Sequence, residues 1–161
     1  MKIKKLYFGI IVISIAVISL VYIISISANE NYPALQNYNG QIDFYKSLSC
    51  GCCDVHASYL RNSGGLDVNI IEVEDISKIK SQYNIPKSFE SCHTVIIGGY
   101  FVEGHIPLEA INKLIADKPD INGILLPGMP SGSPGMPGRK NSEWIIYSMS
   151  KDSTTNEFMR I

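Results

Sequence analysis

The stretch Gln41-Ile-Asp-Phe-Tyr-Lys-Ser-Leu-Ser-Cys-Gly-Cys-Cys53 sets the order of the elements around it. Its first six residues alternate apolar and polar side chains, which is typical of a half-buried β-strand. After the last cysteine, Val55, Tyr59 and Leu60 recur at helical spacing, and Ser63-Gly-Gly65 supplies the glycine stop that commonly ends a helix. The sequence therefore predicts a strand, a cysteine loop and a helix, in that order.

Strands and helices continue to alternate beyond this unit. In chain order we expect a strand at 68–73, a short helix at 76–83, a strand at 94–97 paired in a hairpin with 100–102, a helix between Pro107 and Pro119, and a last strand or hairpin that includes 144–147 and Phe158. Strand, helix and strand followed by a hairpin and a helix is the thioredoxin-like order. The predicted fold class is therefore α/β, a thioredoxin-like domain over residues 40–161.

The first 28 residues predict a membrane anchor or a signal segment. Lys2, Lys4 and Lys5 precede a run from Leu6 to Ala28 that contains no charged residue. A bilayer core requires about 20 apolar residues of helix, whereas the apolar part of a signal peptide is usually about 7–15 residues long. Length favours a retained transmembrane helix, and the small residues before Asn29 leave a cleaved signal as the alternative.

The three N-terminal lysines also predict the orientation. Basic residues beside a membrane segment tend to stay in the cytoplasm, so residues 40–161 should lie outside the cell membrane, after a polar tether at 29–39. Cleavage would make the protein secreted instead. Without those lysines the chain has 11 basic and 15 acidic residues, and this weakly acidic balance with no basic run argues against a nucleic-acid partner.

All four cysteines lie in two short motifs, Cys50-Gly-Cys-Cys53 and Ser91-Cys-His-Thr94. Such clustering suits a soft metal ion, because thiolates bind Cu(I), zinc or an iron–sulfur cluster. Two alternatives remain open. Cys50 and Cys53 have the C-x-x-C spacing of a thiol–disulfide redox pair, and the cysteines could also be purely structural. Zinc fingers usually carry two separated C-x-x-C pairs, and this sequence has only one such spacing, so a structural zinc site is less favoured.

Histidine and methionine residues extend the set of candidate ligands. His93 adjoins a cysteine, and a hairpin would return His105 to the same end of the sheet, so both are candidate ligands. His56, one helical turn after the C-x-C-C motif, is a weaker candidate. The Pro/Gly/Met loop at 127–138 repeats Pro-Gly-Met-Pro and offers two thioethers, Met129 and Met136; it reads equally well as a linker or as a functional loop.

These motifs, together with Gly99-Tyr-x-x-Glu-Gly-His105 and the Pro-Gly-Met-Pro repeat, resemble a predicted metal-binding family that includes periplasmic copper-resistance proteins called CopG. The resemblance covers about residues 41–136. It implies a thioredoxin-like fold, export from the cytoplasm and a copper–thiolate centre. Carried over by position, the thiolates are Cys50, Cys52, Cys53 and Cys92, the nitrogen ligands are His93 and His105, and Met129 and Met136 are second-tier candidates.

The chain departs from the family pattern on the predicted helix. Family members usually carry tryptophan at the position of His56 and histidine at the position of Tyr59, so one possible ligand has moved a turn toward the cysteines or been lost. We expect a membrane-anchored, outward-facing protein that holds Cu(I), as a single ion or as a multinuclear centre, for resistance, homeostasis or delivery to a copper transporter or cuproenzyme. The alternative is an extracytoplasmic thiol–disulfide oxidoreductase. Whether the protein is an enzyme stays open.

Overall fold

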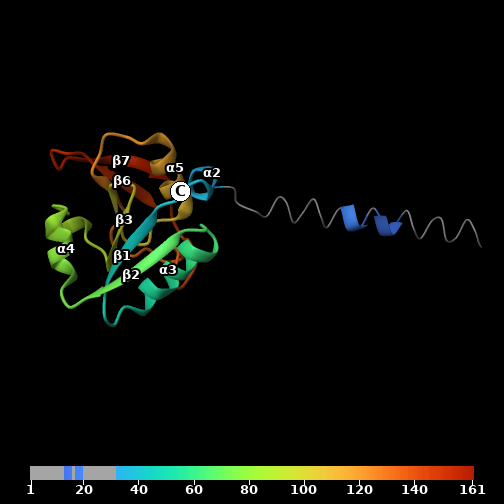
Figure 1. The fold of residues 1–161 in the computed structure, drawn as a ribbon, viewed down its shortest axis with the longest axis horizontal. Helices are drawn as coiled ribbons and strands as arrows, with labels where there is room; N and C mark the ends of the chain where they lie inside the picture. Colours follow the sequence, from blue (N-terminus) through green and yellow to red (C-terminus); the bar gives the residue numbers. More distant parts are fainter. Residues whose placement is uncertain (1–12, 16, 20–31) are drawn as a thin grey trace, which may run out of the picture. The chain divides into compact units, whose positions relative to one another are not determined.

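The computed structural model describes residues 13–15, 17–19 and 32–161 (Figure 1). The chain divides into two units, Met1–Asn31 and Tyr32–Ile161. Most of the predicted membrane segment at 1–28 lies outside the described residues. In the part of the chain that is described, no helix has the length and apolar character needed to cross a membrane.

The second unit contains a seven-stranded mixed sheet, which confirms the α/β class. Its strands are β1 (Gln41–Ser47), β2 (Asp67–Val73), β3 (His93–Ile97), β4 (Tyr100–Glu103), β5 (Gly123–Leu125), β6 (Ile145–Met149) and β7 (Thr155–Arg160). They lie in the order β2-β1-β3-β4-β5-β6-β7. The pairs β1/β2 and β4/β5 are parallel and the other neighbours are antiparallel.

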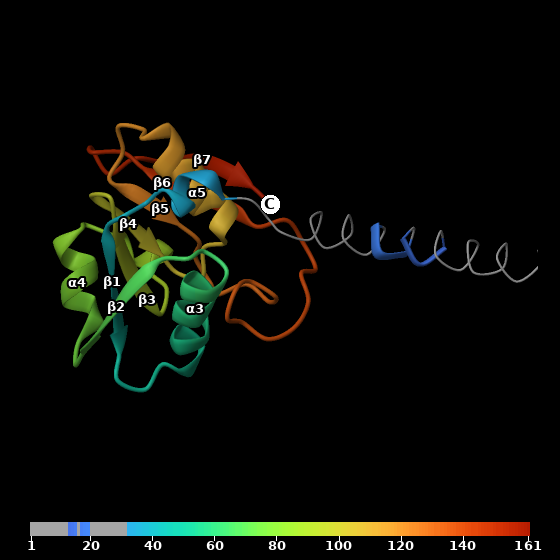
Figure 2. The same cartoon turned by 45° about the vertical axis from the view of Figure 1, so that its right-hand side comes forward.

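The helices are distributed over both faces of this sheet. They are α2 (Pro33–Gln36), α3 (Gly51–Asn62), α4 (Ile76–Gln82) and α5 (Leu108–Asp117), with a 3₁₀ turn, η1, at Lys87–Phe89. Figure 2 shows α3 and α5 on one face and α4 on the other. The stretch predicted as a tether begins to fold before residue 39, because Leu35 of α2 is buried in the core.

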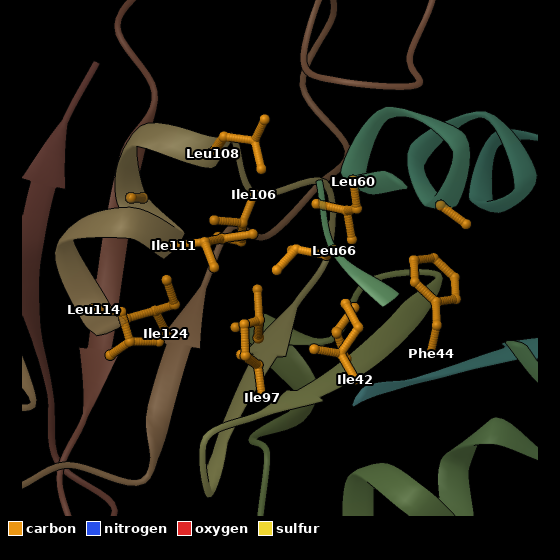
Figure 3. Close-up of a cluster of buried hydrophobic side chains, with 14 of the residues drawn as sticks. Ile42, Phe44, Leu60, Leu66, Ile97, Ile106, Leu108, Ile111, Leu114 and Ile124 are labelled. Atoms are coloured by element: carbon orange, nitrogen blue, oxygen red, sulfur yellow. The ribbon is translucent and has the colours of Figure 1, made fainter. Parts of the chain in front are cut away.

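The main core lies between the sheet and the helices α3 and α5 (Figure 3). Strand residues two apart point to the same face, so Ile42 and Phe44 of β1 join Ile97 of β3 there, while Ile96 packs in the smaller cluster on the α4 side. The apolar face predicted for the helix after Pro107 supplies Leu108, Ile111 and Leu114 to the same core. This alternation fixes which residues reach each face and holds the strand register.

Two predictions near the C-terminus have different outcomes. The expected terminal hairpin is present as β6 and β7, which pair antiparallel. The prediction of the elements before the Pro/Gly/Met loop was incomplete, because it contained no strand between the helix after Pro107 and that loop. Ile124 and Leu125 form β5 in the interior of the sheet, and the irregular loop begins only after it.

Candidate metal centre

Four connections meet at one end of the sheet. β1 ends there and leads into α3, and the register pairs Lys46 of β1 with His93, the first residue of β3. Thr94 pairs with Glu103 at the end of the antiparallel neighbour β4, so His105 follows directly at the same end. Parallel β5 also ends there, where the Leu126 N–H donates to the Glu103 carbonyl at 3.0 Å. Topology therefore brings both cysteine motifs, His105 and the Pro/Gly/Met loop together.

The cysteines gather at the N-terminus of α3. The sulfur atoms of Cys50, Cys52, Cys53 and Cys92 all lie within 4.8 Å of one another. Cys50 and Cys53 form a disulfide, and Cys52 and Cys92 are free thiols whose sulfurs are 4.0 Å apart. The first turn of a helix carries the positive end of its dipole, which favours thiolate ligands at this position.

Two histidines contact the thiol of Cys92. His93 Nδ1 lies 3.2 Å from its sulfur and His105 Nε2 lies 3.0 Å from it. The other ring nitrogen of His105, Nδ1, is 2.7 Å from the carbonyl oxygen of Pro134. A carbonyl can only accept, so Nδ1 carries the proton, and in a neutral ring Nε2 then presents its lone pair toward Cys92.

His56 determines the proton position on His93 in the same way. His56 Nε2 lies 3.0 Å from the carbonyl oxygen of Ile106, so it donates, and His56 Nδ1 must be an acceptor. The acceptor lies 2.7 Å from His93 Nε2, which therefore carries the proton. His93 Nδ1 is left with a lone pair that faces Cys92. Both histidines thus direct an unprotonated nitrogen at one sulfur.

This arrangement is typical of histidines that bind metal ions. A ligating imidazole usually donates its second N–H to a fixed acceptor, which sets its tautomer and orientation. Here His93 donates to His56, and His105 donates to the Pro134 carbonyl. A single thiol proton on Cys92 can satisfy only one of the two lone pairs that face it, whereas a metal ion at that point satisfies both.

Burial keeps all three imidazoles neutral. The side chains of His56, His93 and His105 are fully buried. Desolvation lowers the pKa of His56 to about 3 and lowers the pKa of His93 and of His105 below the usual range. Burial also raises the pKa of the Cys92 thiol to about 12, with a further contribution from Cys52. A neutral imidazole is the ligating form, and a buried thiol is stabilised as a thiolate when a cation displaces its proton.

The Pro/Gly/Met loop packs against this centre. Gly135 has a φ of +84°, and a Cβ added there would lie 2.8 Å from the Cys52 carbonyl oxygen and 2.9 Å from the His56 amide nitrogen. The loop backbone therefore lies directly against α3 (Figure 2). The Pro134 carbonyl that orients His105 belongs to the residue just before Gly135. Met136 is partly buried, whereas Met129 is 39% exposed.

Two buried lysines form ion pairs that connect the elements carrying the candidate ligands. Lys46 at the end of β1 forms ion pairs with Asp54 of α3 at 2.9 Å and with Glu72 of β2 at 3.1 Å. On the α4 side, Lys80 pairs with the fully buried Glu103. Glu103 also accepts from the Thr94 hydroxyl at 2.6 Å, which links the Cys92 motif to the His105 motif.

The structure brings together the six residues that the sequence singled out as ligands: Cys50, Cys52, Cys53, Cys92, His93 and His105. It adds His56, which the sequence ranked lower. The signal available for His56 was its place one helical turn after Cys53. Tyr59, the other departure from the family pattern, accepts a hydrogen bond from the Leu108 amide at 3.1 Å and stacks on His56.

Fold and site together define an α/β protein whose sheet end carries a cluster of thiols and neutral imidazoles suited to a soft or borderline metal ion. Residues 89–136 match a family described as a protein of unknown function, DUF411. Two solved structures of the copper resistance protein CopG, Form 1 and Form 2, are each 34% identical to this chain with a TM-score of 0.69. Each match covers 75% of this chain, and it covers 96% of the Form 1 chain and 97% of the Form 2 chain. No curated protein matches the chain. The chain therefore belongs to the family that contains CopG.

Proposed function

We propose that this protein is a membrane-anchored, extracytoplasmic copper-binding protein that holds Cu(I) in the cysteine cluster. One observation carries the proposal: the four cysteine sulfurs lie within 4.8 Å of one another. Cu(I) is a soft ion that prefers thiolates, and this cluster supplies every sulfur of the cysteines in the chain. The CopG structures, whose name refers to copper resistance, support the same metal.

The finer parts of the proposal rest on different observations. A thioredoxin-like fold is supported by the β1-α3-β2 unit followed by the β3/β4 hairpin and α5, with the cysteines where β1 leads into α3. The uncharged run from Leu6 to Ala28 supports the anchor and the lysines before it support an outward-facing domain. In that location the bound copper would serve resistance, homeostasis or transfer to a copper transporter or cuproenzyme.

The disulfide favours a second candidate function. Cys50 and Cys53 are joined, as in the oxidised state of a C-x-x-C redox pair. An extracytoplasmic thiol–disulfide oxidoreductase would use these two residues as attacking and resolving thiols. Cys92 would then be dispensable, since exchange requires only two thiols. The two functions consequently make opposite predictions for Cys92→Ser.

The deciding experiment uses the full-length chain in detergent, reduced, as wild type and as Cys92→Ser. Competition against a Cu(I) chelator and against a zinc dye should show that the wild type binds Cu(I) far more tightly than Zn(II). In Cys92→Ser the copper bound per chain should fall by more than the proportion expected from losing one of four cysteine ligands. The reason is that the remaining three cysteines cannot complete the centre. Unchanged copper content in the reduced variant would contradict the shared site. A copper-free chain that turns over a disulfide substrate would instead establish the oxidoreductase.

A further inference from the structure

The disulfide changes the donor set of the centre without emptying it. With Cys50 and Cys53 joined, two of the four thiols are withdrawn. The free thiols of Cys52 and Cys92 remain, and the unprotonated nitrogens of His93 and His105 still face Cys92 at 3.2 and 3.0 Å. Two thiolates and two imidazoles form the borderline donor set that zinc takes in proteins.

We infer that the disulfide-closed form is a binding site for one divalent borderline cation, with zinc as the simplest case, held by Cys52, Cys92, His93 and His105. This inference rests on the proposed function in one respect, because the Cu(I) site of the reduced form would share these ligands. The state of the Cys50–Cys53 bond would then select the class of metal: soft monovalent ions for four thiolates, and one divalent ion for two thiolates and two imidazoles.

The distances fit such a site after small movements. Zinc lies about 2.3 Å from sulfur and about 2.0–2.1 Å from nitrogen, so a tetrahedral site separates sulfur from nitrogen by about 3.5 Å and sulfur from sulfur by about 3.8 Å. In the structure, the Cys92 sulfur lies 3.2 and 3.0 Å from the two nitrogens and 4.0 Å from the Cys52 sulfur. Each differs from the tetrahedral value by roughly 0.5 Å or less.

The surroundings favour a divalent ion in this form. Two thiolates cancel the charge of a dication, and neutrality matters because Cys92 is partly buried and both histidines are fully buried. Cu(I) with the same donors would leave a net negative charge. His56 and the Pro134 carbonyl already hold the two imidazoles in the tautomers that such an ion requires.

The inferred site can be tested on the oxidised full-length chain in detergent. A small disulfide reagent takes two electrons and two protons from the thiols of Cys50 and Cys53 and leaves as two thiols, and peptide mass spectrometry verifies that Cys52 and Cys92 stay free. Titration against a chromophoric zinc chelator should then give one Zn(II) per chain. Co(II) should give intense tetrahedral d–d bands together with a thiolate-to-metal charge-transfer band.

Matched variants identify the ligands. Cys50→Ser/Cys53→Ser leaves the same four donors without any oxidant and should keep one Zn(II) per chain. Cys92→Ser and His105→Ala, each checked by circular dichroism, should weaken zinc binding by more than about 10-fold, because even outer-shell partners cost that much. Zinc binding unchanged in both variants would overturn the inference. A wild-type Co(II) spectrum without thiolate charge transfer would overturn it independently of any variant.

Failure of this inference can be distinguished from failure of the proposed function by measuring Cu(I) binding of the reduced chain in parallel. Tight Cu(I) binding without zinc binding in the oxidised chain would overturn the divalent site alone. Zinc binding in the oxidised chain without Cu(I) binding in the reduced chain would support the divalent site and overturn the copper function.

Discussion

At the residue scale, His56 should control metal affinity without touching the metal. His56→Phe keeps a ring that can pack near Tyr59 and Phe44, whose ring centroids lie 5.9 and 6.1 Å from that of His56, but it cannot accept a hydrogen bond from His93. His93 is then free to place its proton on Nδ1, toward Cys92. We expect a loss of about 10–100-fold in Cu(I) affinity of the reduced chain, measured by chelator competition.

A second readout separates this role from ordinary packing. In the metal-free protein, ¹⁵N NMR should show His93 protonated at Nε2 in the wild type and a shift toward the Nδ1 tautomer in His56→Phe. His56→Gln can both accept from His93 and donate to the Ile106 carbonyl, so it should recover part of the affinity. Wild-type affinity and an unshifted His93 tautomer in His56→Phe would refute the positioning role.

Candidate ligands that lie within one short motif could be predicted from the sequence, whereas hydrogen bonds between distant residues could not. Local sequence was enough to identify Cys50, Cys52 and Cys53 as candidate ligands from their spacing, and His93 from its position next to Cys92. The tautomers could not be predicted, because the acceptor for His56 is the Ile106 carbonyl 50 residues away and the acceptor for His105 is the Pro134 carbonyl 29 residues away. Periodicity indicates which face a residue occupies but does not indicate which carbonyl its ring will meet.

At the scale of elements, the Pro/Gly/Met loop should be a structural part of the centre. Gly135→Ala places a methyl group against the backbone of α3 at a positive φ, and Gly128→Ala meets the same kind of backbone penalty at a φ of +79° with no atom within 4 Å. Gly128→Ala should cost about 1–2 kcal/mol in the free energy of unfolding. Gly135→Ala should cost about 1–3 kcal/mol more. Denaturant unfolding of both variants measures the difference.

The same pair of variants reports on metal binding. Displacing the loop in Gly135→Ala withdraws the Pro134 carbonyl from His105, so Cu(I) affinity should fall in Gly135→Ala and stay near wild type in Gly128→Ala. Equal effects of the two substitutions on stability and affinity would mean that the loop only spans the distance between β5 and β6 and does not support the site.

The longer helices and strands could be predicted from the sequence, whereas the shortest strand in the sheet interior could not. β1, β2 and α5 have enough residues for periodicity to be visible, and their expected types are confirmed. β5 has only three residues, Gly123–Leu125, and it exists because β4 and β6 pair with it from both sides. Those pairings join β5 to strands about 20 residues away on either side, so local sequence patterns did not predict this strand.

At the scale of the whole molecule, the N-terminal segment should be retained. The uncharged run from Leu6 to Ala28 is longer than the apolar part of a typical signal peptide. Mass spectrometry of the mature protein should therefore find the peptide that contains this run, and the protein should remain with the membrane fraction after a high-salt wash. A mature N-terminus near Asn29 would show that the protein is secreted instead.

Metal binding should also stabilise the folded domain as a whole, because the ligands come from α3, β3 and the segment after β4, and they converge only in the folded state. An ion present at 100 times its dissociation constant adds about 2.7 kcal/mol, which for a domain of this size raises Tm by roughly 10 °C. We expect that rise when Cu(I) is added to the reduced chain and its reversal by a chelator.

In the oxidised chain the same addition should shift Tm far less, since Cys50 and Cys53 no longer offer thiolates. Each redox state is compared with its own metal-free form, because the disulfide contributes to stability by itself. Equal shifts in the two states would mean that Cu(I) is held without Cys50 and Cys53, and the four-thiolate centre would have to be abandoned.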